Sequence, residues 1–361
     1  MNKCVLQKPD GRALTLYGRH PVATGLVAPS PSTAAFAPNA HLRWHPLRGE
    51  WVAYATHRQN RTFLPPAAYN PLAQTTDPAH PTELPAGDYD VAVFDNLFPA
   101  FTSLAGEPPT LTVPTRPADG ACEVVVFTRD PDASLGMLPL WHLELILSVW
   151  GDRYRALGSR ADVEYVFIFE NRGVEVGVTL GHPHGQIYAY PFVPPVTARE
   201  LANELAHFEA HGTTLLERFI VDERASQRRM LYDGAHVAAF VPVCARYPYE
   251  VWIAPQQAVP SIADLDAAAR GDFACALKTV LLKYDGLWQR PFPYIMAMHQ
   301  APTDGVPHPE AHLHVEFYPA YRMRDRLKYV AGSETGAGVF TADTDPDDKA
   351  AELRAVAVTL E

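Results

Sequence analysis

The sequence predicts an α+β fold in which a mainly antiparallel sheet carries helices packed against it, and in which one structural unit occurs twice. One observation is an order of elements (strand, turn, helix, strand, His-x-His strand) that appears in each half of the 361 residues. Another is that the two His-x-His strands are well separated, because His184 and His314 lie 130 residues apart. The expected strands are also rich in β-branched and aromatic residues, which favour sheets. Self-similarity of this kind indicates an internal duplication.

The two copies can be followed along the chain. The elements of the first copy are expected as a strand at 122–127, a turn at 130–132, a helix at about 138–157, a strand at 165–169 and a strand carrying His182 and His184. The second copy repeats this order with a strand at 249–253, a helix at about 263–284, a strand at 294–298 and a strand at 312–318. Both copies leave the last strand through a tyrosine and a proline, Tyr190-Pro191 and Tyr318-Pro319.

Segments outside the two copies complete the expected organisation. Residues 29–40 are low in sequence complexity and predict a mobile arm or one that orders on contact. The tract 64–85 is rich in Pro, Ala and Thr and predicts an irregular surface loop. An amphipathic helix at 198–221 is expected to link the halves, and a last helix at 346–360 is expected to be capped by Asp345.

The composition limits the class of protein. A hydrophobic content of 47% with 20% charged residues is typical of a soluble globular chain, and no apolar run approaches the roughly 20 residues of a membrane span. Residues 1–16 lack the apolar core of a signal peptide. The four cysteines are scattered, which favours reduced thiols and a cytoplasmic location. A net charge of −11 argues against a nucleic-acid-binding protein.

The most informative segment is Gly-His-Pro-His-Gly-Gln-Ile-Tyr at residues 181–188. If it is extended, His182, His184 and Gln186 point to one face. Gly185 between them would leave room for a group close to the backbone. Two imidazoles and an amide on one face suit catalysis in which a side chain forms a covalent bond to a phosphate. The alternatives are polar residues on a solvated strand face, or two isolated metal ligands.

Several motifs, taken in order, resemble one known family. His182-Pro183-His184-Gly185-Gln186 is similar to the H-P-H-G-Q signature of the galactose-1-phosphate uridylyltransferase family, a branch of the histidine-triad superfamily. Further matching segments are 46–52 with His57, Arg58 and Arg61, then 94–98, 169–173, 299–302 and 313–319. The resemblance covers roughly residues 41–340. It implies duplicated histidine-triad-like domains, which we expect at 41–195 and 196–361 after an N-terminal arm at 1–40.

The resemblance implies a ping-pong reaction. UDP-glucose would donate its uridylyl group to His184, glucose 1-phosphate would leave, and galactose 1-phosphate would accept the group to give UDP-galactose. The backbone-facing nitrogen of His184 would hold a proton so that the other nitrogen attacks the α-phosphorus. The leaving sugar phosphate, whose second pKa is about 6, needs no general acid. The amide of Gln186 can therefore bind phosphoryl oxygens instead.

The resemblance also implies binding residues. Arg58 and Arg61 carry guanidinium groups suited to phosphates, although a solvated strand end would explain them as well. Asn96 and Phe98 would line the uridine pocket, with a turn and core packing as the alternative. The remaining expected contacts are Asn171, Gly177 and Thr179 to phosphates, and Lys328 and Glu334 to the sugar. In the family the sugar segment and the paired arginines are shared across a homodimer interface.

The expected metal content departs from the family pattern. The family's first zinc site uses a C-x-x-C, a further His and the first His of H-P-H, but here Asn70-Pro71-Leu72-Ala73 and Pro131 occupy the other places. One imidazole cannot hold a structural zinc, so we expect this site to be absent and His182 to be a hydrogen-bonded strand residue.

A second metal site is better preserved in the sequence. Glu200, His299 and His314 match three of its ligands, and Glu316 replaces a fourth that is often His. This set suits one Zn²⁺ or Fe²⁺. Glu200 also has an alternative role, because Thr197 and Glu200 form a capping-box pattern. His308 and His312 are expected to be surface or packing residues.

Other departures leave the substrate open. Ser333 replaces a frequent Tyr, Leu97 replaces the Asp of the family's N-D-F, and residues 335–340 are atypical. A related nucleotidyltransferase or phosphorylase acting on an ADP-sugar or dinucleotide is the alternative enzyme. A non-catalytic nucleotide-binding module is a third hypothesis. The pocket around residues 96–98 would discriminate between the two enzymes.

Overall fold

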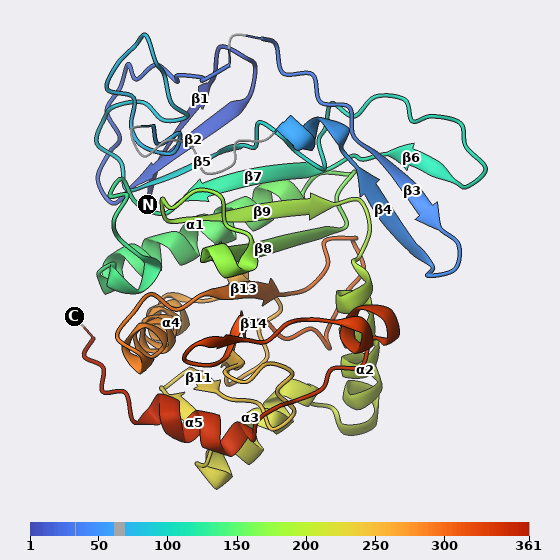
Figure 1. Ribbon diagram of the computed structural model, residues 1–361, viewed down its shortest axis with the longest axis vertical. Helices are drawn as coiled ribbons and strands as arrows, with labels where there is room; N and C mark the ends of the chain where they lie inside the picture. The colour runs from blue at the N-terminus through green and yellow to red at the C-terminus, as the bar shows by residue number, and fades with distance from the viewer. Residues whose placement is uncertain (33, 61–68, 361) are drawn as a thin grey trace.

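The computed structural model describes residues 1–32, 34–60 and 69–360. Its centre is an 11-stranded sheet with the order β1-β2-β5-β7-β9-β8-β13-β14-β12-β11-β10 (Figure 1). Every neighbouring pair in this sheet is antiparallel. The expected mainly antiparallel sheet with packed helices is therefore confirmed.

The duplication is visible in the strand order. The bounds of the repeated strands are β7 Ala121–Val126, β8 Tyr165–Arg172 and β9 His184–Tyr190 in the first half, and β12 Val251–Pro255, β13 Tyr294–His299 and β14 His314–Pro319 in the second. β8 pairs with β13 at the centre, and each is followed outward by its own His strand and then by the first strand of its copy. The register also repeats, because Phe169 lies opposite Gln186 as Ala297 lies opposite Glu316. The two copies thus join edge to edge into one sheet.

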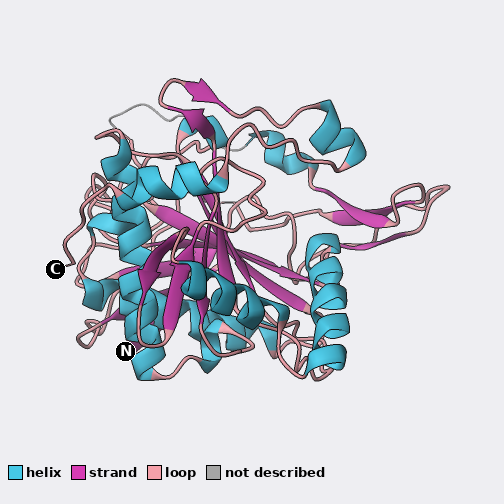
Figure 2. Cartoon of the chain, turned by 90° about the horizontal axis from the view of Figure 1, so that it is seen from below, coloured by secondary structure: helices cyan, strands magenta, loops and turns pink. Residues whose placement is uncertain are grey.

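Two long helices cover one face of the sheet (Figures 1 and 2). α1 spans Leu140–Gly158 and α4 spans Ala267–Leu287, and both contribute to the main core cluster. α4 begins later than the sequence predicts, because Asp266 accepts a hydrogen bond from Ala269 N at 2.8 Å and caps the helix. The preceding residues form the short 3₁₀ helix η4, Ile262–Asp264.

The expected single helix at 198–221 is wrong, because the segment forms two helices. α2 spans Pro195–His211 and α3 spans Leu215–Ser226. Gly212 adopts φ 72°, a left-handed conformation that ends α2, and Thr214 caps α3 through a capping box. Both helices face the side of β12 and β14 opposite to α4, where they help to line a cavity.

The expected N-terminal arm at 1–40 also needs correction, because its first half forms the edge of the sheet. β1 (Asn2–Gln7) pairs with β2 (Ala13–Gly18), which pairs with β5 (Val91–Asp95). Leu14 and Leu16 are fully buried in a second core cluster. The burial of these side chains holds the segment on the sheet.

The remaining elements surround this core. A three-stranded sheet projects to one side, formed by β3 (His41–His45), β4 (Glu50–Tyr54) and β6 (Thr115–Pro117) (Figure 1). The other elements are η1 (Thr56–Asn60), η2 (Leu135–Met137), η3 (Val174–Val176), β10 (Met230–Asp233), β11 (Val237–Phe240), β15 (Tyr321–Met323), β16 (Arg326–Leu327), the π-helix η5 (Ser333–Ala337) and α5 (Pro346–Arg354). Asp345 caps α5 as expected, although the helix ends at Arg354. Among the described residues, no helix combines the length and apolarity that a bilayer crossing requires.

Candidate active site

His184 is the first residue of β9, and one hydrogen bond fixes its ring. Its Nδ1 lies 2.7 Å from the carbonyl oxygen of His182. A carbonyl can only accept, so Nδ1 carries the proton and Nε2 keeps a free lone pair. Burial lowers the pKa of His184 by desolvating the charged ring. The side chain is therefore a neutral imidazole at pH 7, with Nε2 available as a nucleophile.

His184 lies in a cavity of about 440 Å³. The cavity combines apolar walls with a few polar groups, which is typical of a ligand site. Of the sequence-predicted site residues, the structure brings together Arg58, Asn96, Phe98, Asn171, Thr179, His184 and Gln186 in its lining. The other described lining residues are Pro31, Tyr69, Pro71, Leu72, Glu83, Phe94, Leu97, Val124, Phe169, Leu180 and Tyr188.

Strand alternation places two of the three expected motif residues in this cavity. Gln186 and Tyr188 follow His184 at every second position and share its face of β9. His182 does not, because β9 begins only at His184 and His182 lies in the bend before the strand. The expectation that His182 is a strand residue on the same face therefore needs correction.

His182 is buried, and both of its ring nitrogens have partners. Nε2 lies 2.7 Å from the carbonyl oxygen of Thr128, and Nδ1 lies 3.0 Å from the amide nitrogen of Asn70. The ring donates to the carbonyl and accepts from the amide. Asn70 stands where the family has the first cysteine of its zinc site. An amide–imidazole hydrogen bond therefore connects the two segments at this point.

Gly185 is required by the protein core, and the expectation that it leaves room for a ligand is wrong. A Cβ atom at this position would lie 2.7 Å from the ring of Phe127 and 3.0 Å from the carbonyl oxygen of Phe169. Gly185 faces the core side of the sheet because it alternates with His184 and Gln186. Any side chain here would push β9 away from its neighbours, so the residue positions His184 only indirectly.

The end of the cavity around residues 96–98 is built around a turn. Asn96 Oδ1 accepts a hydrogen bond from Phe98 N at 2.8 Å, so this residue forms a turn and lines the cavity at the same time. Arg58 donates to the carbonyl oxygen of Phe98 at 2.7 Å, and it extends from η1 into the lining. Arg61 lies outside the described residues. The rings of Phe94 and Phe169 provide apolar walls.

Three predicted binding residues do not line this cavity. Gly177 ends η3 with φ 81°, a conformation that suits glycine. Lys328 Nζ donates to the carbonyl oxygen of Thr341 at 2.6 Å, and the carboxylate of Glu334 accepts from Ala331 N at 3.1 Å. Lys328 and Glu334 line a different cavity of about 670 Å³. Within one chain, the expected sugar contacts are thus separate from the His184 cavity.

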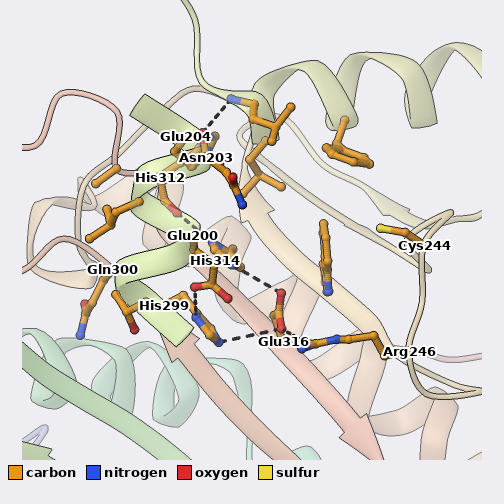
Figure 3. A pocket seen from close by; sticks show the side chains of 17 residues that line it. Glu200, Asn203, Glu204, Cys244, Arg246, His299, Gln300, His312, His314 and Glu316 are labelled. Carbon is orange, nitrogen blue, oxygen red and sulfur yellow. Dashed lines mark hydrogen bonds and ion pairs between the residues drawn. The ribbon is translucent and has the colours of Figure 1, made fainter. Parts of the chain in front are cut away.

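Three of the four expected metal ligands form a cluster in the second half of the chain (Figure 3). Ligand atoms of Glu200, His299 and His314 all lie within 4.8 Å of one another. His299 Nδ1 lies 2.7 Å from Glu200 Oε2. His314 Nδ1 donates to the carbonyl oxygen of His312 at 2.9 Å, which leaves His314 Nε2 free as a ligand atom.

Two expectations about this cluster change. Glu200 does not cap a helix, because α2 begins at Pro195 and Thr197 lies inside it. Glu316 is not part of the three-residue group, since Arg246 holds its Oε2 at 2.7 Å and the hydroxyl of Tyr318 donates to the same oxygen. The Oε1 atom of Glu316 remains 3.7 Å from His314 Nε2. Glu316 therefore lies next to the candidate ligands and balances the charge of Arg246.

His308 and His312 were expected to be surface or packing residues, and the structure agrees. His312 is buried and hydrogen-bonded to Thr214 and to the carbonyl oxygen of Pro255, and burial lowers its pKa to about 4. His308 is paired with Asp304 and Glu310. Both are packing residues.

Tyr188 and Glu83 line the His184 cavity, although neither was predicted from the sequence. Tyr188 could have been found, because it continues the alternation from Gln186. Glu83 carried no signal, since it lies in a tract expected to be a surface loop. Within that tract, Leu84 is buried in the second core cluster and its carbonyl oxygen accepts from Thr75 N at 2.8 Å. These contacts draw Glu83 into the cavity wall.

Two sequence models of one protein family match most of this chain. The sequence model described as "Galactose-1-phosphate uridyl transferase, N-terminal domain" matches residues 33–194, and the one for the C-terminal domain matches residues 200–334. The chain belongs to the galactose-1-phosphate uridylyltransferase family. The expected family, the α+β fold and the nucleotidyltransferase class are thereby confirmed.

Relatives of this family match almost the whole chain. The galactose-1-phosphate uridylyltransferase of Thermotoga maritima is 38% identical over 328 residues, which cover 88% of this chain and 99% of the relative. The enzyme of the same name from Streptomyces lividans is 37% identical over 379 aligned positions, covering 99% of this chain and 98% of the relative. A solved structure titled "Structure of uridylyltransferase" superposes with a TM-score of 0.79 at 33% identity, covering 88% of this chain and 98% of that one.

Proposed function

We propose that this chain transfers the uridylyl group of UDP-glucose to galactose 1-phosphate through a covalent intermediate on His184. The observation that carries the proposal is the ring of His184, whose Nδ1 is protonated and whose Nε2 is free in a cavity that also contains Gln186. Two named relatives with this activity match at least 88% of the chain, which supports these substrates over an ADP-sugar or dinucleotide.

The chemistry has two displacements. Nε2 of His184 attacks the α-phosphorus, and the bond from that phosphorus to the bridging oxygen breaks, so that glucose 1-phosphate leaves with the electron pair. In the second step a phosphate oxygen of galactose 1-phosphate attacks the same phosphorus, the N–P bond breaks, and UDP-galactose forms. The hydrogen bond from Nδ1 to the carbonyl of His182 stabilises the positive charge that the ring carries in the intermediate.

The residues around His184 suit the negative charge that the phosphoryl oxygens carry during the transfer. Gln186 is a neutral amide donor, and Asn171 and Thr179 add neutral polar groups to the same lining. Arg58 brings a guanidinium close to the phosphates. We assign phosphate binding to these four residues, with Arg61 and Gly177 as further contacts, and uridine binding to Asn96 and Phe98.

We also propose that the working unit is a homodimer with a shared active site. Lys328 and Glu334 are assigned to the sugar, yet they line a cavity that His184 does not line in the same chain. A second subunit that supplies these residues would complete the site.

The proposed division into two domains at 41–195 and 196–361 fits the two ranges that the family models match. The four free cysteines support a cytoplasmic location.

We propose one divalent transition metal, Zn²⁺ or Fe²⁺, at Glu200, His299 and His314. Two imidazoles and a carboxylate are a donor set that such ions accept. When bound, the ion would connect α2 to β13 and β14 and would act structurally. Glu316, held by Arg246, lies outside the inner set of ligands but keeps its second oxygen near His314.

The metal proposal predicts at most about one transition metal per chain. His299→Ala removes a buried ligand and is expected to lower the metal content of the purified protein severalfold, while His182→Asn leaves it unchanged. Elemental analysis of both variants beside the wild type measures this. Two metals per chain, or metal lost only on substitution of His182, would contradict the proposal.

A direct test of the covalent mechanism is intact-protein mass spectrometry after incubation with UDP-glucose alone. We expect the wild-type chain to gain the mass of one uridylyl group and to lose it again when galactose 1-phosphate is added. No mass gain, together with steady production of UDP-galactose, would indicate direct transfer between substrates and would rule out the intermediate.

A further inference from the structure

Glu83 is the single carboxylate among the described residues that line the His184 cavity. The residue is only 5% exposed and belongs to the tract 64–85, which precedes the repeated strands and helix of the first half. A buried carboxylate in a pocket for a negatively charged nucleotide is unfavourable unless it has a specific partner, because it repels the phosphates and loses hydration. Its presence therefore requires an explanation.

Two buried cations hold Glu83 in place. Lys8 Nζ lies 2.5 Å from Glu83 Oε2, and the guanidinium of Arg12 lies 2.9 Å from Oε2 and 3.1 Å from Oε1. Asp10 occupies another side of Arg12 at 2.8 Å. Two cations and two carboxylates thus form a neutral buried cluster behind the cavity wall. The cluster fixes the position of Glu83, while its oxygens retain further lone pairs that can accept hydrogen bonds.

A carboxylate accepts hydrogen bonds, so its partner on a UDP-sugar must be a donor. The glucosyl hydroxyls are donors, but the sugar is assigned above to Lys328 and Glu334, which line a different cavity. The phosphates are acceptors only. The N3–H of uracil is flanked by two carbonyl oxygens, which would face the same carboxylate and repel it. The 2′- and 3′-hydroxyls of ribose form a pair of adjacent donors that matches the two oxygens of a carboxylate, as in dinucleotide sites. Leu97, where the family has an Asp, offers no acceptor in the same lining.

We propose that Glu83, oriented by Lys8 and Arg12, accepts hydrogen bonds from the ribose hydroxyls of the nucleotide and makes the enzyme selective for ribonucleotide donors. The inference rests on the nucleotide pocket proposed above. Glu83 is then a specificity-determining residue in the tract that precedes the first repeated strand. Lys8 and Arg12 are positioning residues, because they act through it.

The test compares UDP-glucose with its 2′-deoxy and 3′-deoxy analogues. For each donor, kcat/KM is measured from the release of glucose 1-phosphate. A hydrogen bond to a charged group is worth enough to give the wild type a preference of about 10- to 100-fold over at least one analogue. In Glu83→Gln the preference is expected to fall to about 3-fold or less, since a neutral amide binds a hydroxyl more weakly.

Asp10→Asn is the matched control. It removes one carboxylate from the same buried cluster, but Asp10 does not line the cavity. Its thermal stability should fall about as much as that of Glu83→Gln, while its ribose preference stays at the wild-type value. If Glu83→Gln does not fold, Glu83→Asp retains the charge and withdraws the oxygens by one methylene, and it should also lose the preference.

These measurements test the role of Glu83 separately from the proposed uridylyl transfer. A wild type that uses all three donors within about 2-fold overturns the inference, and so does a folded Glu83 variant that keeps the full preference. A preference lost equally in Asp10→Asn overturns it as well, because the effect would then be structural. Failure of the wild type to form a uridylyl adduct from UDP-glucose would count against the proposed function instead.

Discussion

Replacing His184 by glycine is expected to abolish both half-reactions, with a loss on the order of 10⁴-fold or more in kcat. The imidazole supplies the atom that forms the bond to phosphorus, and no other described histidine lines the cavity. The measurements are the isotope exchange between glucose 1-phosphate and UDP-glucose and the intact mass after incubation with UDP-glucose. The unfolding temperature should change little, since the half-buried side chain makes one hydrogen bond to its own segment.

The control for this variant is His80→Gly, which makes the same chemical change at an exposed position outside the cavity. It should retain wild-type exchange. Retention of even a few per cent of exchange in His184→Gly, after contamination by wild type is excluded, would show that His184 is not the nucleophile.

The lowered pKa of His184 also predicts how adduct formation depends on pH. Because burial favours the neutral ring, the nucleophile stays unprotonated to a pH below the ordinary imidazole pKa of about 6.5. The rate of adduct formation from UDP-glucose should therefore change little as the pH falls from 8 to 7.5, and it should reach half of its high-pH value only below pH 6.5. A rate that already halves near pH 7.5 would contradict a lowered pKa.

Gln186→His is expected to slow transfer to galactose 1-phosphate and to increase hydrolysis. Losing a neutral donor to the developing charge typically costs about 3 kcal/mol, or roughly a hundredfold in rate. An imidazole at this position can in addition act as a general base for water. Val124 and Phe169 lie opposite Gln186 on the neighbouring strands, so a ring here would stand in the same cavity.

The measurement for this variant is the release of UMP and the formation of UDP-galactose from UDP-glucose, followed side by side with the wild type. Gln186→Asn is a useful companion, since it keeps the amide without adding a base and should slow transfer without raising hydrolysis. An unchanged partition in Gln186→His would remove acceptor selection from Gln186 and assign it to the segment around Lys328 and Glu334.

Much of this protein could be predicted from the sequence because the relevant signals are local. Alternation along a strand places His184 and Gln186 on one face whatever surrounds the strand, and the second His-x-His segment at His314 revealed the duplication. The family motifs likewise placed Arg58, Asn96, Asn171 and Thr179, which the structure brings into one cavity. The capping of α5 by Asp345 is also local, and it is observed.

Only the tertiary structure shows the roles of residues whose packing or pairing partners are distant in the sequence. Gly185 is small because Phe127 and the backbone at Phe169 pack against it, and no spacing in the sequence reports that contact. Glu200 fits a capping box by sequence, but α2 begins earlier and its carboxylate meets His299, which is 99 residues away. The sequence predicts that Glu83 belongs to a surface loop. In the structure its neighbour Leu84 is buried and Glu83 pairs with Lys8 and Arg12, and these contacts place it in the cavity wall. Partners distant in sequence fix charges and side-chain positions through burial and pairing, and these depend on the folded chain as a whole.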